Sequence, residues 1–234
     1  MINYITFNGV PSTEFDLYVG GQFSFKAPRK DIVKVDIPGR NGDLIFDNGT
    51  YSNIEITYVI VGMNNFKSKI NLIKDWLLSP VGYTILEDTY DTDHYRYATL
   101  ASGIDFIMSC LNKFGKANII FDCKPQRFLN SGDTVTALSA SGTLTNPTPF
   151  NAKPLIVCTG AGTLTIKSQT ITVASGLSPI TIDCENMDCY SGTTNANSYV
   201  TFSTDDFPVL EPGANAYSRT GFSSVKVTPR WWRL

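Results

Sequence analysis

The stretch NIEITYVIVGMNNFKSKINLIKDWLLSP, residues 53–80, contains the two patterns that decide the fold. Residues 53–61 are rich in Ile, Val and Thr and begin with the apolar–polar alternation of a half-buried strand. Over residues 64–78 the period changes, and apolar side chains recur at steps of four, three and four, at Phe66, Ile70, Ile73 and Leu77. The sequence therefore predicts a strand followed by one amphipathic helix that lies across a sheet.

The ends of this helix are also marked in the sequence. Asn64 or Asn65 can cap its first turn, and Ser79-Pro80 ends it, because proline disfavours helical geometry in the residue before it. Trp76 adjoins the apolar stripe and is predicted to lie in the core or at its rim. The charged residues of the segment fall mainly off the stripe, at Lys67, Lys69, Lys74 and Asp75.

Most of the remaining chain is typical of β-strands. Runs rich in Val, Ile and Thr occur at 32–38, 116–122, 153–159, 163–174 and 179–184, and YRYATL (95–100) is expected to start another strand. Turn-forming clusters separate them, at Pro38-Gly39-Arg40-Asn41-Gly42-Asp43, Asp47-Asn48-Gly49 and Gly160-Ala161-Gly162. Residues 163–174 predict a hairpin with its tip near Lys167-Ser168-Gln169.

A change of composition near residue 128 predicts two domains. Between Ser131 and Thr204, 24 of 74 residues are Ser or Thr and only six are charged, whereas the earlier part carries the helix and most of the charges. We therefore expect an N-terminal β domain with a helix over residues 1–130 and a small C-terminal β-sandwich over residues 131–234. The fold class is mainly β with one amphipathic helix.

Composition argues against several classes of function. A net charge of −2 gives no electrostatic footprint for nucleic acid, and no basic run would hold the chain against a membrane. No stretch approaches the roughly 18 apolar residues of a membrane span, and the N-terminus, MINYITFNGVPSTEF, lacks the pattern of a signal peptide. Synthesis in a cytoplasm is expected.

The side chains needed for catalysis do not form a recognisable motif. The single histidine, His94, lies in EDTYDTDHYR, residues 87–96, which lacks zinc and calcium motifs and is predicted to be a solvated hairpin connection. A calcium site at Asp183, Glu185 and Asp188 is a weaker alternative to polar residues at a strand end. Five cysteines are expected to be buried free thiols: Cys110, Cys123, Cys158, Cys184 and Cys189. The sequence thus predicts a non-enzymatic protein with no metal and no cofactor.

The C-terminal PRWWRL contains two adjacent tryptophans, Trp231 and Trp232. They are candidates for an interface, for the core of the last strand, or for a platform on which a sugar stacks. In an extended segment the two side chains point to opposite faces.

Motifs along nearly the whole chain carry a resemblance to a known family. In the N-terminal part they are IPGRNGDL (37–44), Gly49-Thr50-Tyr51, the helix with Trp76, and YRYATL (95–100). In the C-terminal part they are Asn146-Pro147-Thr148, LIVCTGAGTLTI (155–166), ITIDCENMDCY (180–190), FPVLEPGAN (207–215) and VTPRWWR (227–233). In this order and spacing the sequence resembles the distal tail protein (Dit) family of siphophages that infect Gram-positive bacteria.

The resemblance implies a structural role. In that family the N-terminal domain resembles a tail-tube subunit and assembles into a hexameric ring, and the C-terminal domain is a galectin-like or carbohydrate-binding-module-like sandwich. The ring connects the tail tube to the tail-tip or baseplate apparatus for host attachment. The implied partners are further copies of the chain, the tail-tube protein, the tail-associated tip or lysin protein and, in some phages, a receptor-binding protein. The implied location is the virion.

The resemblance also places the loop Pro38-Gly39-Arg40-Asn41-Gly42-Asp43 in the ring-forming domain. We expect this loop to contact a neighbouring subunit or to line the ring; an ordinary tight connection is the alternative. Two other functions remain open, a carbohydrate-binding adhesion module and another tail-tube or baseplate component. The sandwich shows no evident groove with two aromatic platforms, which weighs against the first.

Overall fold

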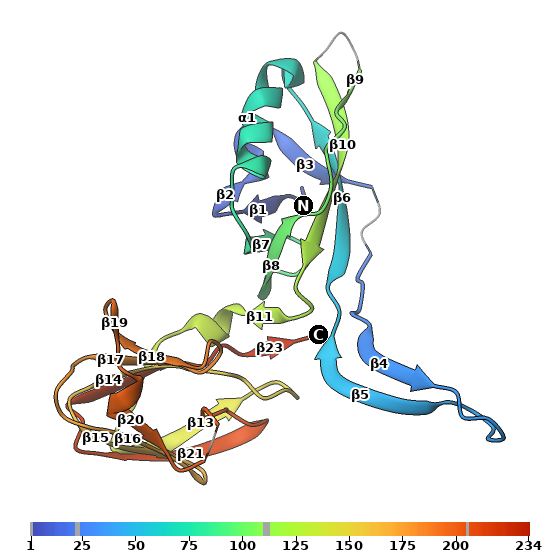
Figure 1. The fold of residues 1–234 in the computed structure, drawn as a ribbon. Coiled ribbons are helices and arrows are strands. Elements are labelled where there is room, and N and C mark those ends of the chain that lie inside the picture. Colours follow the sequence, from blue (N-terminus) through green and yellow to red (C-terminus); the bar gives the residue numbers. More distant parts are fainter. Residues whose placement is uncertain (1, 22–23, 110–112, 205) are drawn as a thin grey trace. The chain divides into compact units, whose positions relative to one another are not determined.

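The computed structural model describes residues 2–21, 24–109, 113–204 and 206–234 (Figure 1). The chain folds as two compact units, Met1–Arg127 with Leu234, and Phe128–Arg233. No helix within these described ranges has the length and apolar character that a membrane span requires. Cys110 lies outside the described residues.

The first unit is built on one antiparallel sheet. Its strands run in the order β2-β1-β7-β8-β10-β6-β3, with β9 paired to β10. The bounds are β1 (Ile5–Phe7), β2 (Val10–Pro11), β3 (Leu17–Gly20), β6 (Ile54–Gly62), β7 (Thr84–Asp88), β8 (His94–Leu100), β9 (Ile107–Ser109) and β10 (Phe114–Cys123), and a 3-10 turn, η1 (Ser12–Phe15), precedes β3. The strands predicted at 53–61, 95–100 and 116–122 are therefore present.

The sheet has one buried face because buried and exposed side chains alternate along its central strands, and the pairing of these strands places the buried ones on the same side. β6 and β10 pair along their whole length, and in both strands every second side chain is buried. The side chains on this face, among them Ile56, Tyr58 and Phe121, form one core with residues of the helix α1 (Phe66–Leu78). Strand alternation and helical periodicity together place this core between the sheet and α1.

The helix α1 confirms the predicted amphipathic stripe. Phe66, Ile73 and Leu77 are buried and Ile70 packs against the core. Trp76 is also buried, and its indole N–H donates to the carbonyl of Phe7 at 3.0 Å. The hydrogen bond satisfies the one polar group of this side chain, so Trp76 is a core residue.

The predicted position of the cap at the start of α1 is correct, but the cap lacks a side-chain hydrogen bond. Asn65 occupies the N-cap position with a left-handed φ of 57°, and its side chain makes no capping hydrogen bond. One tertiary and one local contact hold this end instead: the Phe66 N–H donates to the Lys113 carbonyl at 3.2 Å, and Ser68 Oγ donates to the Asn65 carbonyl, three residues earlier, at 2.8 Å. A carbonyl from the residue before β10 takes the first N–H of the helix.

Two paired glycines make room for the first side chain of α1. Gly62 of β6 lies directly opposite Gly115 of β10. A Cβ at Gly62 would lie 2.1 Å from a ring carbon of Phe66, and a Cβ at Gly115 would lie 2.0 Å from two others. The ring therefore packs directly on backbone, which only glycine at both positions allows.

Residues 30–51 form a separate two-stranded sheet, the β4–β5 hairpin, made of β4 (Lys30–Val35) and β5 (Leu44–Tyr51). The sequence predicts a strand at 32–38 and, at Asp47-Asn48-Gly49, a cluster able to supply a positive φ or a turn; these residues lie inside β5, so there is no turn between strands here. Gly49 does adopt a positive φ of 71°, at an irregularity in the register between the two strands. The turn-like sequence marks a bulge within a strand.

The second unit is a sandwich of two antiparallel sheets. One sheet has the order β12-β22-β14-β17-β18-β19 and the other β13-β21-β15-β16-β20. The first sheet comprises β12 (Thr136–Ala137), β14 (Leu155–Thr159), β17 (Ile180–Asp183), β18 (Asp188–Ser191), β19 (Thr194–Asn195) and β22 (Ser224–Thr228). The second comprises β13 (Ser141–Asn146), β15 (Gly162–Ile166), β16 (Gln169–Val173), β20 (Val200–Phe202) and β21 (Gly213–Thr220).

The core of the second unit draws side chains from both sheets, such as Ile156 and Val225 from one and Leu164 and Ile171 from the other. The predicted hairpin is present, with Lys167 in its turn at a φ of 51°. Short elements follow: β11 (Arg127–Leu129), which starts at the last residue of the first unit and pairs with β23 (Trp232–Arg233), and, in the second unit, the 3-10 turns η2 (Asn130–Asp133) and η3 (Asn197–Tyr199). The predicted fold class, mainly β with one amphipathic helix, is confirmed.

Two buried asparagines explain two of the sequence motifs. Asn146 donates to the carbonyls of Phe150 and Leu210, and its Oδ1 accepts from the N–H and hydroxyl of Thr148. Asn215 donates to the carbonyls of Glu211 and Gly213 and accepts from the Glu211 N–H. Both side chains satisfy backbone groups of turns inside the sandwich, so these motifs are structural.

Candidate assembly site

The β4–β5 hairpin presents a face made entirely of apolar side chains. Val33 lies directly opposite Phe46, and Val35 directly opposite Leu44, so the four side chains share one side of the ribbon. Val33 and Phe46 are 48% and 54% exposed. Among the described residues of the first unit, the core includes none of the four. This apolar face, defined by Val33, Val35, Leu44 and Phe46, is exposed at Val33, Val35 and Phe46 and half-buried at Leu44.

Charged side chains stabilise the base of the hairpin on the other side. Lys30 of β4 forms an ion pair and hydrogen bond with Asp47 of β5. The hydrogen bond from Lys30 lowers the pKa of Asp47, and the same contact raises the pKa of Lys30. Both groups are open to solvent, so the pair contributes little stability but ties one strand to the other.

The carboxylates of Asp31 and Asp47 hold the bulge in β5. Asp31 Oδ2 accepts from Asn48 Nδ2 at 3.0 Å and from Thr50 Oγ1 at 3.2 Å. The Gly49 N–H donates to Asp47 Oδ1 at 3.0 Å. Because a bulge bends and twists its strand, these bonds set the direction of the apolar face relative to the base of the hairpin.

The loop singled out in the sequence, residues 38–43, connects the two strands of this hairpin. All six residues are exposed, and Gly39 and Gly42 have φ values of 84° and 81°. The Arg40 N–H donates to the carbonyl of Ile37 at 3.1 Å, which closes a turn. Arg40 and Asp43 form no ion pair with any described residue. The loop is a charged tip next to an apolar ribbon.

Sequence reasoning missed the second half of this surface. Leu44, Ile45 and Phe46 were not predicted as a strand, because the turn signal at residues 47–49 left too few residues for one. The signal that could have found them is the run Leu44-Ile45-Phe46 after a Gly-rich loop, which mirrors Ile32-Val33 before it.

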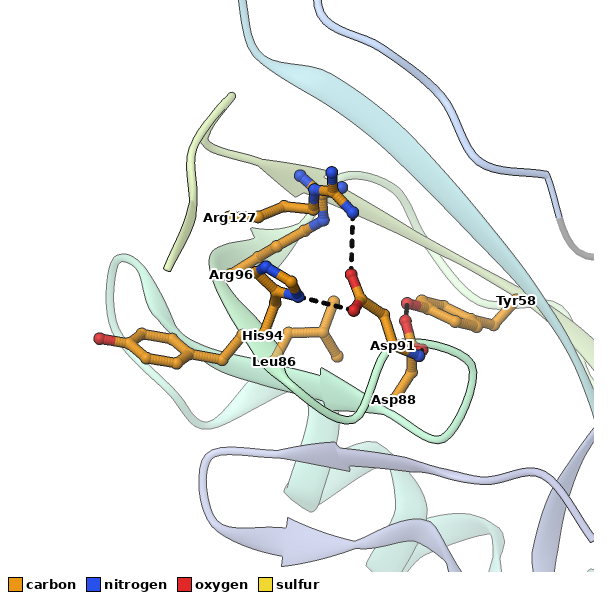
Figure 2. Close-up of a pocket in the computed structure, with 8 residues that line it drawn as sticks. Tyr58, Leu86, Asp88, Asp91, His94, Arg96 and Arg127 are labelled. Carbon is orange, nitrogen blue, oxygen red and sulfur yellow. Dashed lines mark hydrogen bonds and ion pairs between the residues drawn. The ribbon is translucent and has the colours of Figure 1, made fainter. Parts of the chain in front are cut away.

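A polar cluster lies at the connection between β7 and β8 (Figure 2). Asp91 lies between His94 and Arg127, with Oδ1 2.7 Å from His94 Nδ1 and Oδ2 2.9 Å from Arg127 Nη1. Asp88 accepts from the Tyr58 hydroxyl at 2.6 Å and from the N–H groups of Tyr90 and Asp91. The predicted hairpin connection is present and Thr92 and Asp93 at its tip are exposed, but the side chains of His94 and Asp91 are only 16% and 24% exposed.

This polar cluster is too tightly packed for a substrate. The cavity that its residues line has a volume of about 10 Å³, which accommodates roughly one water molecule. His94 Nε2 and Arg96 Nη1 are buried there without a hydrogen-bond partner among the described residues. Burial lowers the pKa of Arg96. Through Asp91 the cluster binds Arg127, the last residue of the first unit before the second begins.

The predicted aromatic pair separates into a buried and a half-buried side chain. Trp231 is 6% exposed and belongs to the core of the second unit. Trp232 stacks on Phe150 with ring centroids 4.4 Å apart, and its indole N–H donates to the Asn151 carbonyl at 2.9 Å. One face of Trp232 and its polar atom are therefore already engaged, which leaves little of a sugar platform.

The candidate metal ligands are likewise engaged. Asp183 binds Arg230 with an Oδ1–Nη1 distance of 2.6 Å, Glu185 pairs with Lys153, and Asp188 accepts from Asn197 Nδ2. Burial alone would raise the pKa of Asp183, but the hydrogen bonds and charge of Arg230 outweigh it and hold that pKa below its usual value. Among the described residues, no three His, Cys, Asp or Glu side chains gather as a metal site would require.

The four described cysteines are buried free thiols, as predicted: Cys123, Cys158, Cys184 and Cys189. Burial raises the pKa of Cys123 and of Cys158 to about 12. A thiol with such a pKa is almost entirely protonated at neutral pH and is a poor nucleophile or metal ligand.

The fold defines a class of mainly β protein with a helix-backed sheet, an uncovered hairpin and a two-sheet sandwich. A solved structure has the same fold over 100% of both chains, with a TM-score of 0.72 and 13% sequence identity. It is the crystal structure of the Dit protein (gp 19.1) of phage SPP1, described as a paradigm of the hub adsorption apparatus in Gram-positive infecting phages. No family model and no curated protein sequence matches the chain. The likeness establishes the shared fold.

Proposed function

We propose that this chain is a structural virion protein of a siphophage tail tip, a distal tail protein that joins the tail tube to the host-adhesion apparatus. The observation that carries the proposal is the likeness to the SPP1 Dit protein, which extends over both units and both whole chains. The ordered motifs from residues 37–44 to 227–233 point independently to the same family. A shared fold alone permits many functions, so the assembly surface has to carry the rest of the argument.

The β4–β5 hairpin supports self-association. An isolated two-stranded ribbon is marginally stable in water, and this one leaves the apolar face of Val33, Val35, Leu44 and Phe46 uncovered. A contact with another copy removes that face from water and stabilises the ribbon in the same step. The loop of residues 38–43 then lies at the edge of the contact, where Arg40 and Asp43 can pair with the neighbouring copy.

The proposed assembly is a ring of six copies, with the first unit as the ring-forming domain and the second as an outer β-sandwich. Its further partners are the tail-tube protein on one side and the tail-associated tip protein on the other, with a receptor-binding protein as a third. The protein is made in the host cytoplasm and functions in the virion. A non-enzymatic role is supported by the engagement of His94, of the carboxylates at 183–188 and of the buried thiols in structural contacts.

Negative-stain electron microscopy of the purified full chain, together with light scattering, tests this function. We expect discrete rings with sixfold averages that do not extend into long tubes. The matched variant Arg40→Ala/Asp43→Ala tests the loop and should lower the fraction of rings without unfolding the chain. A chain that stays monomeric at high concentration, with or without a tail-tube protein, would contradict the proposal, and so would open-ended tubes.

A further inference from the structure

The second unit has an open sheet edge at β13 (Ser141–Asn146). β13 is the first strand of its sheet, and β21 is its one partner strand among the described residues. The two strands pair through every residue of β13 without a shift in register. Leu144 and Asn146 are buried, and the other four residues of the strand are exposed. One side of β13 is therefore accessible to a further strand.

The ladder with β21 leaves the backbone groups of alternate residues free at this edge. The Arg219 N–H donates to the Ala140 carbonyl at 2.8 Å, and hydrogen-bonded pairs recur at every second residue of an antiparallel ladder. The residues between these pairs, Ser141, Thr143 and Thr145, therefore direct their N–H and C=O groups to the open edge. The Ser141 carbonyl already accepts a nearby serine hydroxyl at 2.7 Å. Both backbone groups of Thr143 and of Thr145 are available to another strand.

The side chains beside this edge are small and uncharged. On the outer face of the sheet, hydroxyl side chains of β13 lie directly opposite small side chains of β21, in the pairs Ser141–Ser218, Thr143–Ala216 and Thr145–Ala214. No charged residue occurs in the sequence between Asp133 and Lys153. A further strand can therefore approach to the ladder spacing of about 4.7–4.9 Å without meeting a long or charged side chain of β13.

Other edge strands of the chain carry features that oppose pairing with another molecule. Short strands, charged side chains, prolines and bulges all have this effect. β2, β3, β9, β12, β19 and β20 have at most four residues each. The longer strands β4 and β5 carry Lys30, Asp31, Lys34 and Asp47. The six residues of β13 include no charge and no proline and pair without a bulge, so this edge is the one left unprotected.

The chemistry of this edge fits a second copy of itself. In two antiparallel strands related by a half-turn, a side chain near the axis lies opposite its own copy, so a charge there would face an identical charge. β13 has no such conflict. With Thr143 on the axis, Ser141 would lie opposite Thr145 of the other copy, and all three residues with edge-facing backbone groups would take part. We propose that β13 pairs antiparallel with β13 of a second copy and joins the two sheets into one.

This pairing is a different contact from the ring contact of the proposed function. Neighbours in a ring of six are related by one-sixth of a turn, whereas a strand that pairs with its own copy needs a half-turn. The β13 pair therefore joins chains that are not ring neighbours, such as chains of two separate rings. Breaking the pair halves the mass of the assembly and leaves each ring intact.

Light scattering of the full chain tests the pair through the mass of the assembly. Thr143→Lys places like charges opposite each other at the axis and should halve the mass. Thr143→Pro removes an edge-facing N–H without removing a bond to β21, and it should have the same effect. Thr172→Lys is the matched control, because Thr172 is exposed on β16, which lies between two other strands of the same sheet. This variant should keep the wild-type mass.

Mixing two variants separates pairing from a general loss of stability. Thr143→Lys and Thr143→Glu should each have half the wild-type mass, and their equimolar mixture should regain the full mass, because opposite charges then face each other. A wild-type mass equal to that of Thr143→Lys, a halved mass in Thr172→Lys, or a mixture that stays at half the mass would each overturn the β13 pair and leave the proposed function standing. Halving and rescue without rings in electron micrographs would support the pair and count against the ring.

Discussion

Replacing Gly115 with alanine should destabilise the first unit, because it inserts a methyl group into the space that Phe66 occupies. The added Cβ would lie 2.0 Å from two ring carbons of Phe66, whereas carbon atoms in contact lie about 3.5–4.0 Å apart. The ring must either move by about 1.5 Å, at an overpacking cost of about 1–3 kcal/mol, or leave its site, at the 3–5 kcal/mol typical of losing a buried phenylalanine. We expect a loss of about 3 kcal/mol.

Pulsed thiol labelling during urea denaturation measures this loss in one unit at a time. Cys123 lies in the core of the first unit, and Cys158 in that of the second, so mass spectrometry of the labelled peptides separates the two transitions. With a denaturant slope of about 1–3 kcal/mol per molar, the midpoint at Cys123 should fall by ~1–3 M in Gly115→Ala. The midpoint at Cys158 reports an unaffected unit and should stay in place.

Two further variants separate steric conflict from a general effect of alanine. Gly103→Ala places its Cβ in open space and should change stability by no more than about 0.5 kcal/mol. In the double variant Gly115→Ala/Phe66→Ala the conflict disappears, so it should be no less stable than Phe66→Ala alone. If the urea midpoint measured at Cys123 were the same in Gly115→Ala as in Gly103→Ala, the packing of α1 on the paired glycines would be refuted.

Three other outcomes follow from the same structure. Phe46→Ser should shift the chain toward monomer in light scattering, whereas Val135→Ser, equally exposed in the second unit, should not; equal association in both would contradict the role of the hairpin. Because the pKa of Asp183 is lowered in the folded state, its contribution to stability is present above its unfolded pKa, about 3.9, and is lost as pH falls through the folded value. The melting temperature of the second unit should therefore fall more steeply below about pH 4 in the wild type than in Asp183→Asn, in which this titration is absent; parallel curves would argue against the Arg230 pair. The four buried thiols should not react with a disulfide reagent at pH 8 until denaturant is added, so at most one of the five cysteines per chain should titrate in the native state.

The elements that local periodicity specifies could be predicted from the sequence. The steps between Phe66, Ile70, Ile73 and Leu77 predicted α1 and its buried face, and alternation predicted β6 and β10. These predictions succeed because a side chain's direction in a regular element depends only on its position in the repeat. The hairpin at residues 163–174 was found for the same reason, since its turn residues lie next to the strands they join.

The errors occurred where a distant residue replaced a local interaction. Asn65 can cap a helix, but the carbonyl of Lys113 takes the first N–H of α1 instead. Asp47-Asn48-Gly49 has the composition of a turn, yet Asp31 on the facing strand binds the polar groups there and keeps the segment in β5. The segment around His94 has the composition of a solvated loop, and Arg127, 36 residues after Asp91, helps to bury it.

The sequence by itself determined the class of this protein: a mainly β chain with one amphipathic helix, buried free thiols and no assembled catalytic motif. Only the tertiary structure decided where its uncovered surfaces lie. The apolar face of the hairpin exists because strand pairing places Val33 against Phe46. A contact between residues far apart in the chain depends on which surfaces the whole fold has already buried, and no local repeat in the sequence encodes that.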